Sequence, residues 1–114
     1  MKSKFKSIET GYHKSAKLIL AKWVAGIIED PLTVRNEFII IPDVICITDG
    51  IITHAYEIIH SNPITGRKLA MYDYWAYMNG TSITVFGVSS DFVLAQTDKP
   101  NYISADCYII DPCN

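Results

Sequence analysis

The sequence predicts an α/β (α+β) domain with a mixed central sheet flanked by helices, built in the order α-β-β-β-α-β. Three observations support this class: an apolar stripe with helical period near the start, apolar β-branched segments around an Asp-Gly pair, and a second helical stripe followed by another apolar segment. With 114 residues, 49% of them apolar and 19% charged, the chain has the size and composition of one globular domain. We expect a single domain over residues 1–114, with its core at about 8–90 and a C-terminal extension at 91–114.

The first helix is expected from Ile8 to about Ile28, ending before Asp30-Pro31. At about 100° per residue, Glu9 falls on the same angle as Ile27, inside the apolar stripe, with His13 close by and Lys17 at its edge. A Glu on the core-facing side of a helix needs a partner or a functional role, unless that helix end projects into solvent. The stripe itself consists of Tyr12, Ala16, Ile19, Leu20, Trp23 and Ile27.

Three strands are expected between the two helices. Pro42-Asp43 separates the first strand from the second, because proline cannot donate to a sheet ladder. Asp49-Gly50 is a strong signal for a two-residue hairpin turn, so the second and third strands should pair with each other. The expected strands cover residues 38–41, 44–48 and 51–60.

Two carboxylates are expected to meet at one end of this hairpin. If the turn at Asp49-Gly50 is tight, Glu57 lies opposite position 42 or 43, and therefore close to Asp43. Adjacent carboxylates repel each other unless a cation binds between them, and a hard divalent cation such as Mg²⁺ suits such oxygen ligands. The alternative is two independent carboxylates in solvent.

The second helix is expected to start at Asn62-Pro63 and to run to about Met78, with Asn79-Gly80 as its C-terminal cap. Lys68 lies in the middle of its apolar stripe, where an ammonium would reach toward an anion or snorkel into water. The stripe consists of Ile64, Met71, Trp75 and Met78. Beyond it we expect a strand at 82–88, a short helix from Asp91 and a strand near 108–110.

Charge is unevenly distributed along the chain. The net charge of −2 argues against a generic nucleic-acid binder, but residues 1–22 carry six Lys and one Glu, and the remainder is strongly acidic. No apolar run is long enough for a membrane span, and we expect an intracellular, cytoplasmic protein with no membrane partner. The odd number of cysteines favours reduced thiols, with Cys46 in the core, while Cys107 and Cys113 could pair or bind a metal.

The order of these elements and residues resembles the PD-(D/E)XK nuclease superfamily, which has a restriction-endonuclease-like αβββαβ core. Pro42-Asp43 resembles the PD element, and Glu57-Ile58-Ile59 falls where (D/E)XK should be. Within the superfamily the chain is most similar to the competence-protein CoiA nuclease-like family, over about residues 8–90. The residues that carry this likeness are Glu9, His13 and Lys17 on the opening helix, Glu37 before Pro42-Asp43, and the stretch Glu57-Ile58-Ile59-His60-Ser61.

The resemblance implies an intracellular Mg²⁺- or Mn²⁺-dependent DNA endonuclease of prokaryotic, phage or viral origin. Asp43, Glu57 and the backbone carbonyl of Ile58 would hold the metal, and Glu9 would join through a water. His13 and Lys17 would contact phosphate or orient Glu9. The Lys-rich start would attract the DNA backbone.

One departure from the motif concerns its lysine, whose position is taken by Ile59. Some superfamily members carry that lysine on the following helix, so Lys68 is the candidate for positioning the attacking water. His60 is the second candidate, although strand alternation turns it to the face opposite Glu57.

Two other functions remain open at this stage. The domain could be a catalytically inactive PD-(D/E)XK-like module that binds DNA or a protein partner, or an unrelated small α+β interaction protein whose carboxylates are structural. A domain of this size offers little surface to grip a duplex, so a homodimer is expected. The partner would then cover some aromatic residues of the second helix, which are Tyr72, Tyr74, Trp75 and Tyr77.

Overall fold

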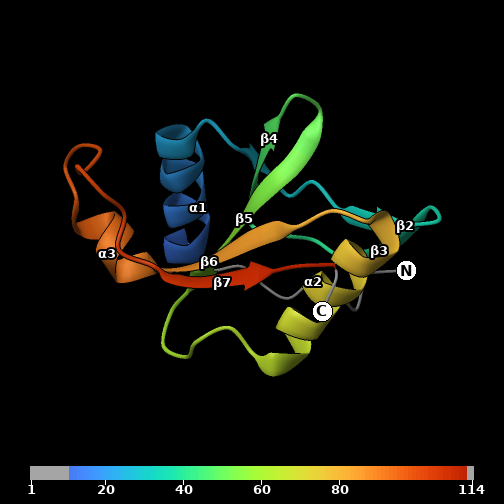
Figure 1. Ribbon diagram of the computed structural model, residues 1–114. Helices are drawn as coiled ribbons and strands as arrows, with labels where there is room; N and C mark the ends of the chain where they lie inside the picture. The colour runs from blue at the N-terminus through green and yellow to red at the C-terminus, as the bar shows by residue number, and fades with distance from the viewer. Residues whose placement is uncertain (1–10, 113–114) are drawn as a thin grey trace, which may run out of the picture.

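The computed structural model describes residues 11–112, and within them the chain forms a mixed α+β fold (Figure 1). Five strands form the central sheet in the order β1-β4-β5-β6-β7, and β5 and β6 are its parallel pair. The elements are α1 (Gly11–Val24), β1 (Ile27–Ile28), β2 (Leu32–Val34), β3 (Glu37–Ile40), β4 (Val44–Thr48), β5 (Ile51–Ile59), α2 (Gly66–Asn79), β6 (Ile83–Ser89), α3 (Ser90–Ala95) and β7 (Asp106–Ile110). The predicted fold class is confirmed.

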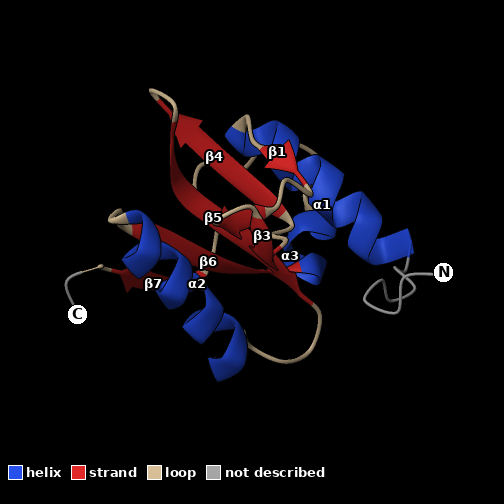
Figure 2. Ribbon diagram, turned by 90° about the vertical axis from the view of Figure 1, so that its right-hand side faces the viewer, coloured by secondary structure: helices blue, strands red, loops and turns tan. Residues whose placement is uncertain are grey.

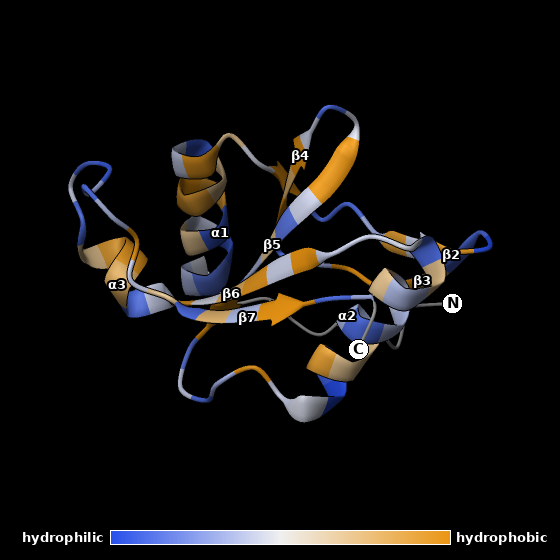
Figure 3. Cartoon of the chain, in the orientation of Figure 1, coloured by the Kyte–Doolittle hydropathy of each residue, from blue (hydrophilic) through white to orange (hydrophobic). Residues whose placement is uncertain are grey.

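Helices cover both faces of the central sheet (Figure 2). One apolar cluster joins α2 to the face that carries Ala55 and Ile59, and a second joins α1 and α3 to the face that carries Tyr56 and Ile58. The strands are rich in apolar residues, whereas the loop between α3 and β7 is hydrophilic (Figure 3). The side chains of β5 alternate between the two clusters. Its odd-numbered residues from Ala55 to Ile59 therefore face α2, and the even-numbered ones face α1.

The first helix ends earlier than the sequence predicted. It stops at Val24, not near Ile28, because Ile27 and Ile28 form a short strand opposite Ile45 and Val44. Gly26 permits this turn, since a Cβ there would lie 2.4 Å from Val44 Cγ1. The prediction that Glu9 and Ile27 lie on one face of the same helix is therefore wrong, because Ile27 is a strand residue. Glu9 itself lies outside the described residues.

The first predicted strand belongs to a separate small sheet. β3 pairs with β2, a strand that was not predicted from the sequence. Arg35 and Asn36 in the turn between them both have positive φ, as two-residue hairpin turns of type I′ require. This hairpin packs against α2. β4 and β5 form the predicted hairpin, and their pairing ends at Thr48 opposite Ile51 around the tight turn.

The later elements follow the sequence closely, apart from one boundary. The α2 helix begins at Gly66 with Thr65 as its N-cap, three residues after the expected start, and it ends at the expected cap, Gly80, with φ of 63°. After residue 90, α3 packs on α1, and β7 joins the central sheet beside β6. Within residues 11–112, no helix is long and apolar enough to cross a membrane.

The described cysteines, Cys46 and Cys107, are free thiols, and Cys113 lies outside the described part of the chain.

Candidate functional site

Asp43 lies where the chain passes from the small sheet into the central sheet. Pro42, fully buried, lies with Asp43 between the end of β3 and the start of β4 at Val44. Val44 pairs with Tyr56, and the same register continued by one residue places position 43 opposite Glu57. The expected proximity of the two backbone positions at the end of the hairpin is therefore present, and the contacts of each side chain are described below.

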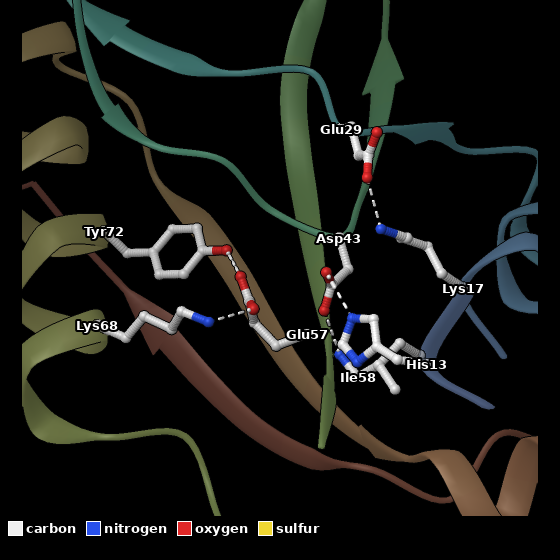
Figure 4. Close-up of polar contacts among 8 residues, drawn as sticks. All are labelled: His13, Lys17, Glu29, Asp43, Glu57, Ile58, Lys68 and Tyr72. Atoms are coloured by element: carbon white, nitrogen blue, oxygen red, sulfur yellow. Dashed lines mark hydrogen bonds and ion pairs between the residues drawn. The ribbon is translucent and has the colours of Figure 1, made fainter. Parts of the chain in front are cut away.

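Two groups hold the Asp43 carboxylate. Its Oδ2 accepts a hydrogen bond from the Ile58 N–H at 2.8 Å, and its Oδ1 lies 3.1 Å from His13 Nε2 (Figure 4). Since a carboxylate oxygen only accepts hydrogen bonds, the contact with His13 places a proton on Nε2. Asp43 thus connects the α1 helix to the β5 strand.

Glu57 points to the other face of the sheet and is almost fully buried, at 2% exposure. Its Oε1 accepts a hydrogen bond from Lys68 Nζ at 2.9 Å, and its Oε2 accepts one from the Tyr72 hydroxyl. Lys68 and Tyr72 are four residues apart on α2, so both face the sheet from adjacent turns. The Thr65 hydroxyl accepts from the Lys68 N–H at 3.2 Å and so caps the helix at this point.

Burial and neighbouring charges shift the pKa of Glu57 and of its two partners. Burial raises the pKa of the Glu57 carboxyl, and the negative charge of Asp43 raises it further, while Lys68 and Tyr72 act in the opposite direction. Burial disfavours the ammonium of Lys68, but the charge and hydrogen bond of Glu57, helped by Asp43, raise its pKa above the ordinary value. Burial and the neighbouring Glu57 also raise the pKa of Tyr72, so its hydroxyl remains a donor at neutral pH.

Carboxylates are ligands of the kind that Mg²⁺ and Mn²⁺ take from proteins, and the binding of either ion by Asp43 and Glu57 stays a prediction. Mg²⁺ usually takes one or two carboxylates from the protein and completes its shell with waters and substrate phosphates, and Mn²⁺ also prefers oxygen ligands. Asp43 and Glu57 supply two carboxylates from neighbouring strand positions. Among residues 11–112, no group of three or more His, Cys, Asp or Glu side chains is placed to hold a metal ion, so a closed all-protein cage is not formed there.

The remaining predicted residues are distributed around this pair. Lys17 is buried and its Nζ donates to Glu29 Oε2 at 2.7 Å. His60 Nδ1 lies 3.3 Å from Ser90 Oγ, on the α3 side of the sheet, as strand alternation predicted. Ile59 packs in the cluster that includes α2, on the face of Glu57. The metal contact expected of the Ile58 carbonyl stays a prediction.

Two residues of this region were not anticipated from the sequence. Tyr72 had a usable signal, because it lies four residues after Lys68 and so on the same helical face. Glu29 had none, because its place beside Asp43 depends on the pairing of β1 with β4.

Comparisons with protein-family models, with curated proteins and with solved structures found no match to this chain.

Proposed function

We propose that the protein is a metal-dependent DNA endonuclease of the PD-(D/E)XK type, which hydrolyses phosphodiester bonds. The observation that carries the proposal is the contact of Lys68 Nζ with Glu57 Oε1, beside Asp43 at the end of the β4–β5 hairpin. Lys68 supplies, from the α2 helix, the ammonium that the motif places at the position occupied here by Ile59. A buried carboxylate with an ammonium in contact with it, and a second carboxylate near enough for its charge to act on the first, are groups that this hydrolysis needs.

The metal would be held by Asp43, Glu57 and the Ile58 carbonyl. When bound, Mg²⁺ or Mn²⁺ polarises a phosphate and lowers the pKa of a bound water. The protein's own groups prepare this site: His13 and the Ile58 N–H orient Asp43, while Tyr72 orients Glu57.

Lys68 acts in this scheme as a cation and not as a base. Its raised pKa keeps the ammonium protonated at neutral pH, so it can donate a hydrogen bond to the attacking water and stabilise negative charge on the phosphate. Its side chain is 45% exposed, which leaves it accessible to a substrate, whereas Glu57 is covered.

Exposed lysines on α1 would supply the attraction to DNA. Lys14 and Lys22 lie on its outer surface, and each phosphate contact adds sequence-independent, salt-sensitive affinity. We expect the lysines that precede α1 to contribute in the same way.

One observation favours a second function, an inactive module that binds DNA or protein. All four oxygens of Asp43 and Glu57 have a hydrogen-bond partner within the protein. A network satisfied in this way can also serve only to hold the hairpin and α2 together.

Cleavage of supercoiled plasmid with Mg²⁺ or Mn²⁺ separates these functions. We expect nicking by the wild-type protein, its loss in Asp43→Ala and Glu57→Gln, and its retention in Asp73→Asn, an exposed carboxylate on α2. Thermal unfolding and calorimetric titration with Mn²⁺ accompany the assay. Nicking that persists in a folded Asp43→Ala protein contradicts the nuclease proposal. DNA retention in gels without metal binding or nicking supports the inactive module.

A further inference from the structure

The buried lysine of α1 has a partner that ties it to the backbone of Asp43. Lys17 is 4% exposed, between the buried residues Ala16 and Leu20 on the same helix. An ammonium in such a place is costly unless it is paired. Its Nζ donates to Glu29 Oε2 at 2.7 Å, and the Glu29 side chain is largely exposed. Glu29 is therefore a partner of this buried ammonium.

Glu29 is held in a backbone conformation that residues with a Cβ rarely adopt. Its φ is 55°, in the left-handed region, directly after the end of β1. In that conformation the Glu29 N–H donates to the Asp43 carbonyl oxygen at 3.3 Å. One residue thus binds α1 through its side chain and Asp43 through its backbone. Unfavourable backbone conformations persist where surrounding contacts enforce them, and they are common at functional sites.

The α1 helix consequently reaches Asp43 by two routes. His13 contacts the Asp43 side chain directly, and Lys17, one turn later on α1, reaches the Asp43 backbone through Glu29 (Figure 4). The first route orients the carboxylate and the second fixes the point from which it projects. Both contacts restrain Asp43 from the side of α1.

We infer that Lys17 and Glu29 are positioning residues, which hold Asp43 in the geometry that the proposed metal site requires. This inference rests on the proposed function for its catalytic consequence, although the clamp itself is a property of the fold. It assigns Lys17 to the interior of the protein and not to contact with a DNA phosphate. It also adds Glu29, which belongs to none of the motif elements, to the support of the site.

The Ile58 amide provides a test that does not depend on activity. Its N–H donates to Asp43 Oδ2, so its hydrogen exchange reports whether that carboxylate stays in place. We expect Lys17→Met and Glu29→Gln each to speed this exchange about tenfold, as when one hydrogen bond of ordinary net strength is weakened. The double variant should add little to either single one, since both residues act in one clamp. Asp43→Ala gives the fully released rate, and Lys99→Met and Asp98→Asn are exposed controls.

Binding and cleavage then separate positioning from DNA contact. We expect both variants to weaken Mn²⁺ binding and lower kcat while leaving KM for DNA and the salt dependence of DNA binding unchanged. A lysine that contacts phosphate would instead reduce the salt slope by about one. Unchanged Ile58 exchange and Mn²⁺ affinity in both variants overturn the clamp, even if Asp43→Ala abolishes cleavage. If wild-type protein neither binds metal nor cleaves, the nuclease proposal fails, while faster Ile58 exchange still supports the clamp.

Discussion

The ammonium nitrogen of Lys68 lies 2.9 Å from Glu57 Oε1 and joins the α2 helix to a buried position of β5. The pair is asymmetric, because the lysine side chain is half exposed and the glutamate is covered. Lys68 is thus the solvent-exposed member of the pair.

Replacement of Lys68 by methionine should separate catalysis from metal binding. We expect Lys68→Met to lower the cleavage rate roughly 10²–10³-fold, the range usual for the loss of one donor that stabilises charge in the transition state. Mn²⁺ affinity should be kept or increased, because Glu57 loses a competing cation. Single-turnover cleavage and calorimetric titration measure the two effects, with Arg67→Met as the control at the adjacent exposed residue. A cleavage rate within about twofold of wild type excludes this role for Lys68.

Tyr72 should contribute to stability through Glu57. Tyr72→Phe removes the hydroxyl that donates to Glu57 Oε2 in the buried core. The free energy of unfolding, measured in urea, should fall by about 1–3 kcal/mol, because a buried carboxylate oxygen loses its donor. Tyr74→Phe, on the exposed side of the same helix, should change it by less than about 0.5 kcal/mol. Equal effects of the two substitutions count against the buried hydrogen bond.

The pH dependence of stability should reveal the raised pKa of Glu57. Because the folded protein binds this proton more tightly than the unfolded chain, the stabilisation is greatest at low pH. It is lost as the pH rises from the ordinary value of about 4.3 through the raised pKa. The stability of wild type relative to Glu57→Gln should thus decrease over this window in metal-free thermal unfolding. A relative stability that grows with pH would mean that the Glu57 pKa is lowered.

Lys14 and Lys22 should act on DNA affinity and not on the chemical step. Each is exposed on α1, and we expect the double replacement Lys14→Gln/Lys22→Gln to reduce the slope of log K against log[salt] by about two. The cleavage rate at saturating DNA should stay the same, with Lys99→Gln as the control for a lysine outside α1. A lower saturated rate with an unchanged salt slope contradicts this division of roles.

The end of the α1 helix could not be predicted from the local sequence pattern. Its apolar periodicity predicted the helix correctly over Gly11–Val24, but the same pattern continued into Ile27 and Ile28, which are strand residues. Short runs of β-branched residues satisfy both periods, and only the available partner strand, β4, decided between them. The strand at β3 was predicted, but its pairing with β2 in a separate sheet was not, because that pairing also depends on which partner strand is available.

The candidate site was predictable only in part. The Asp49-Gly50 turn sets the register at the tip of the hairpin, and a register shift between Cys46 and Ile47 then moves position 43, and not position 42, opposite Glu57. The place of Lys68 follows from its helical face, as the sequence indicated. The contact of Glu29 with Asp43 depends on the pairing of β1 with β4 and on the positive φ of Glu29, which a glutamate rarely adopts. The sequence pattern therefore could not predict it.

The amino-acid sequence was sufficient to predict the two long helices, the tight hairpin and the proximity of positions 43 and 57, because turn residues and side-chain periodicity act over a few neighbours. The group that each carboxylate contacts could be learned only from the packed fold. Packing of α1 and α2 on opposite faces of the sheet directs Asp43 toward His13 and Glu57 toward Lys68 and Tyr72. These contacts join segments that are distant in the chain, and their formation depends on the burial of both sheet faces.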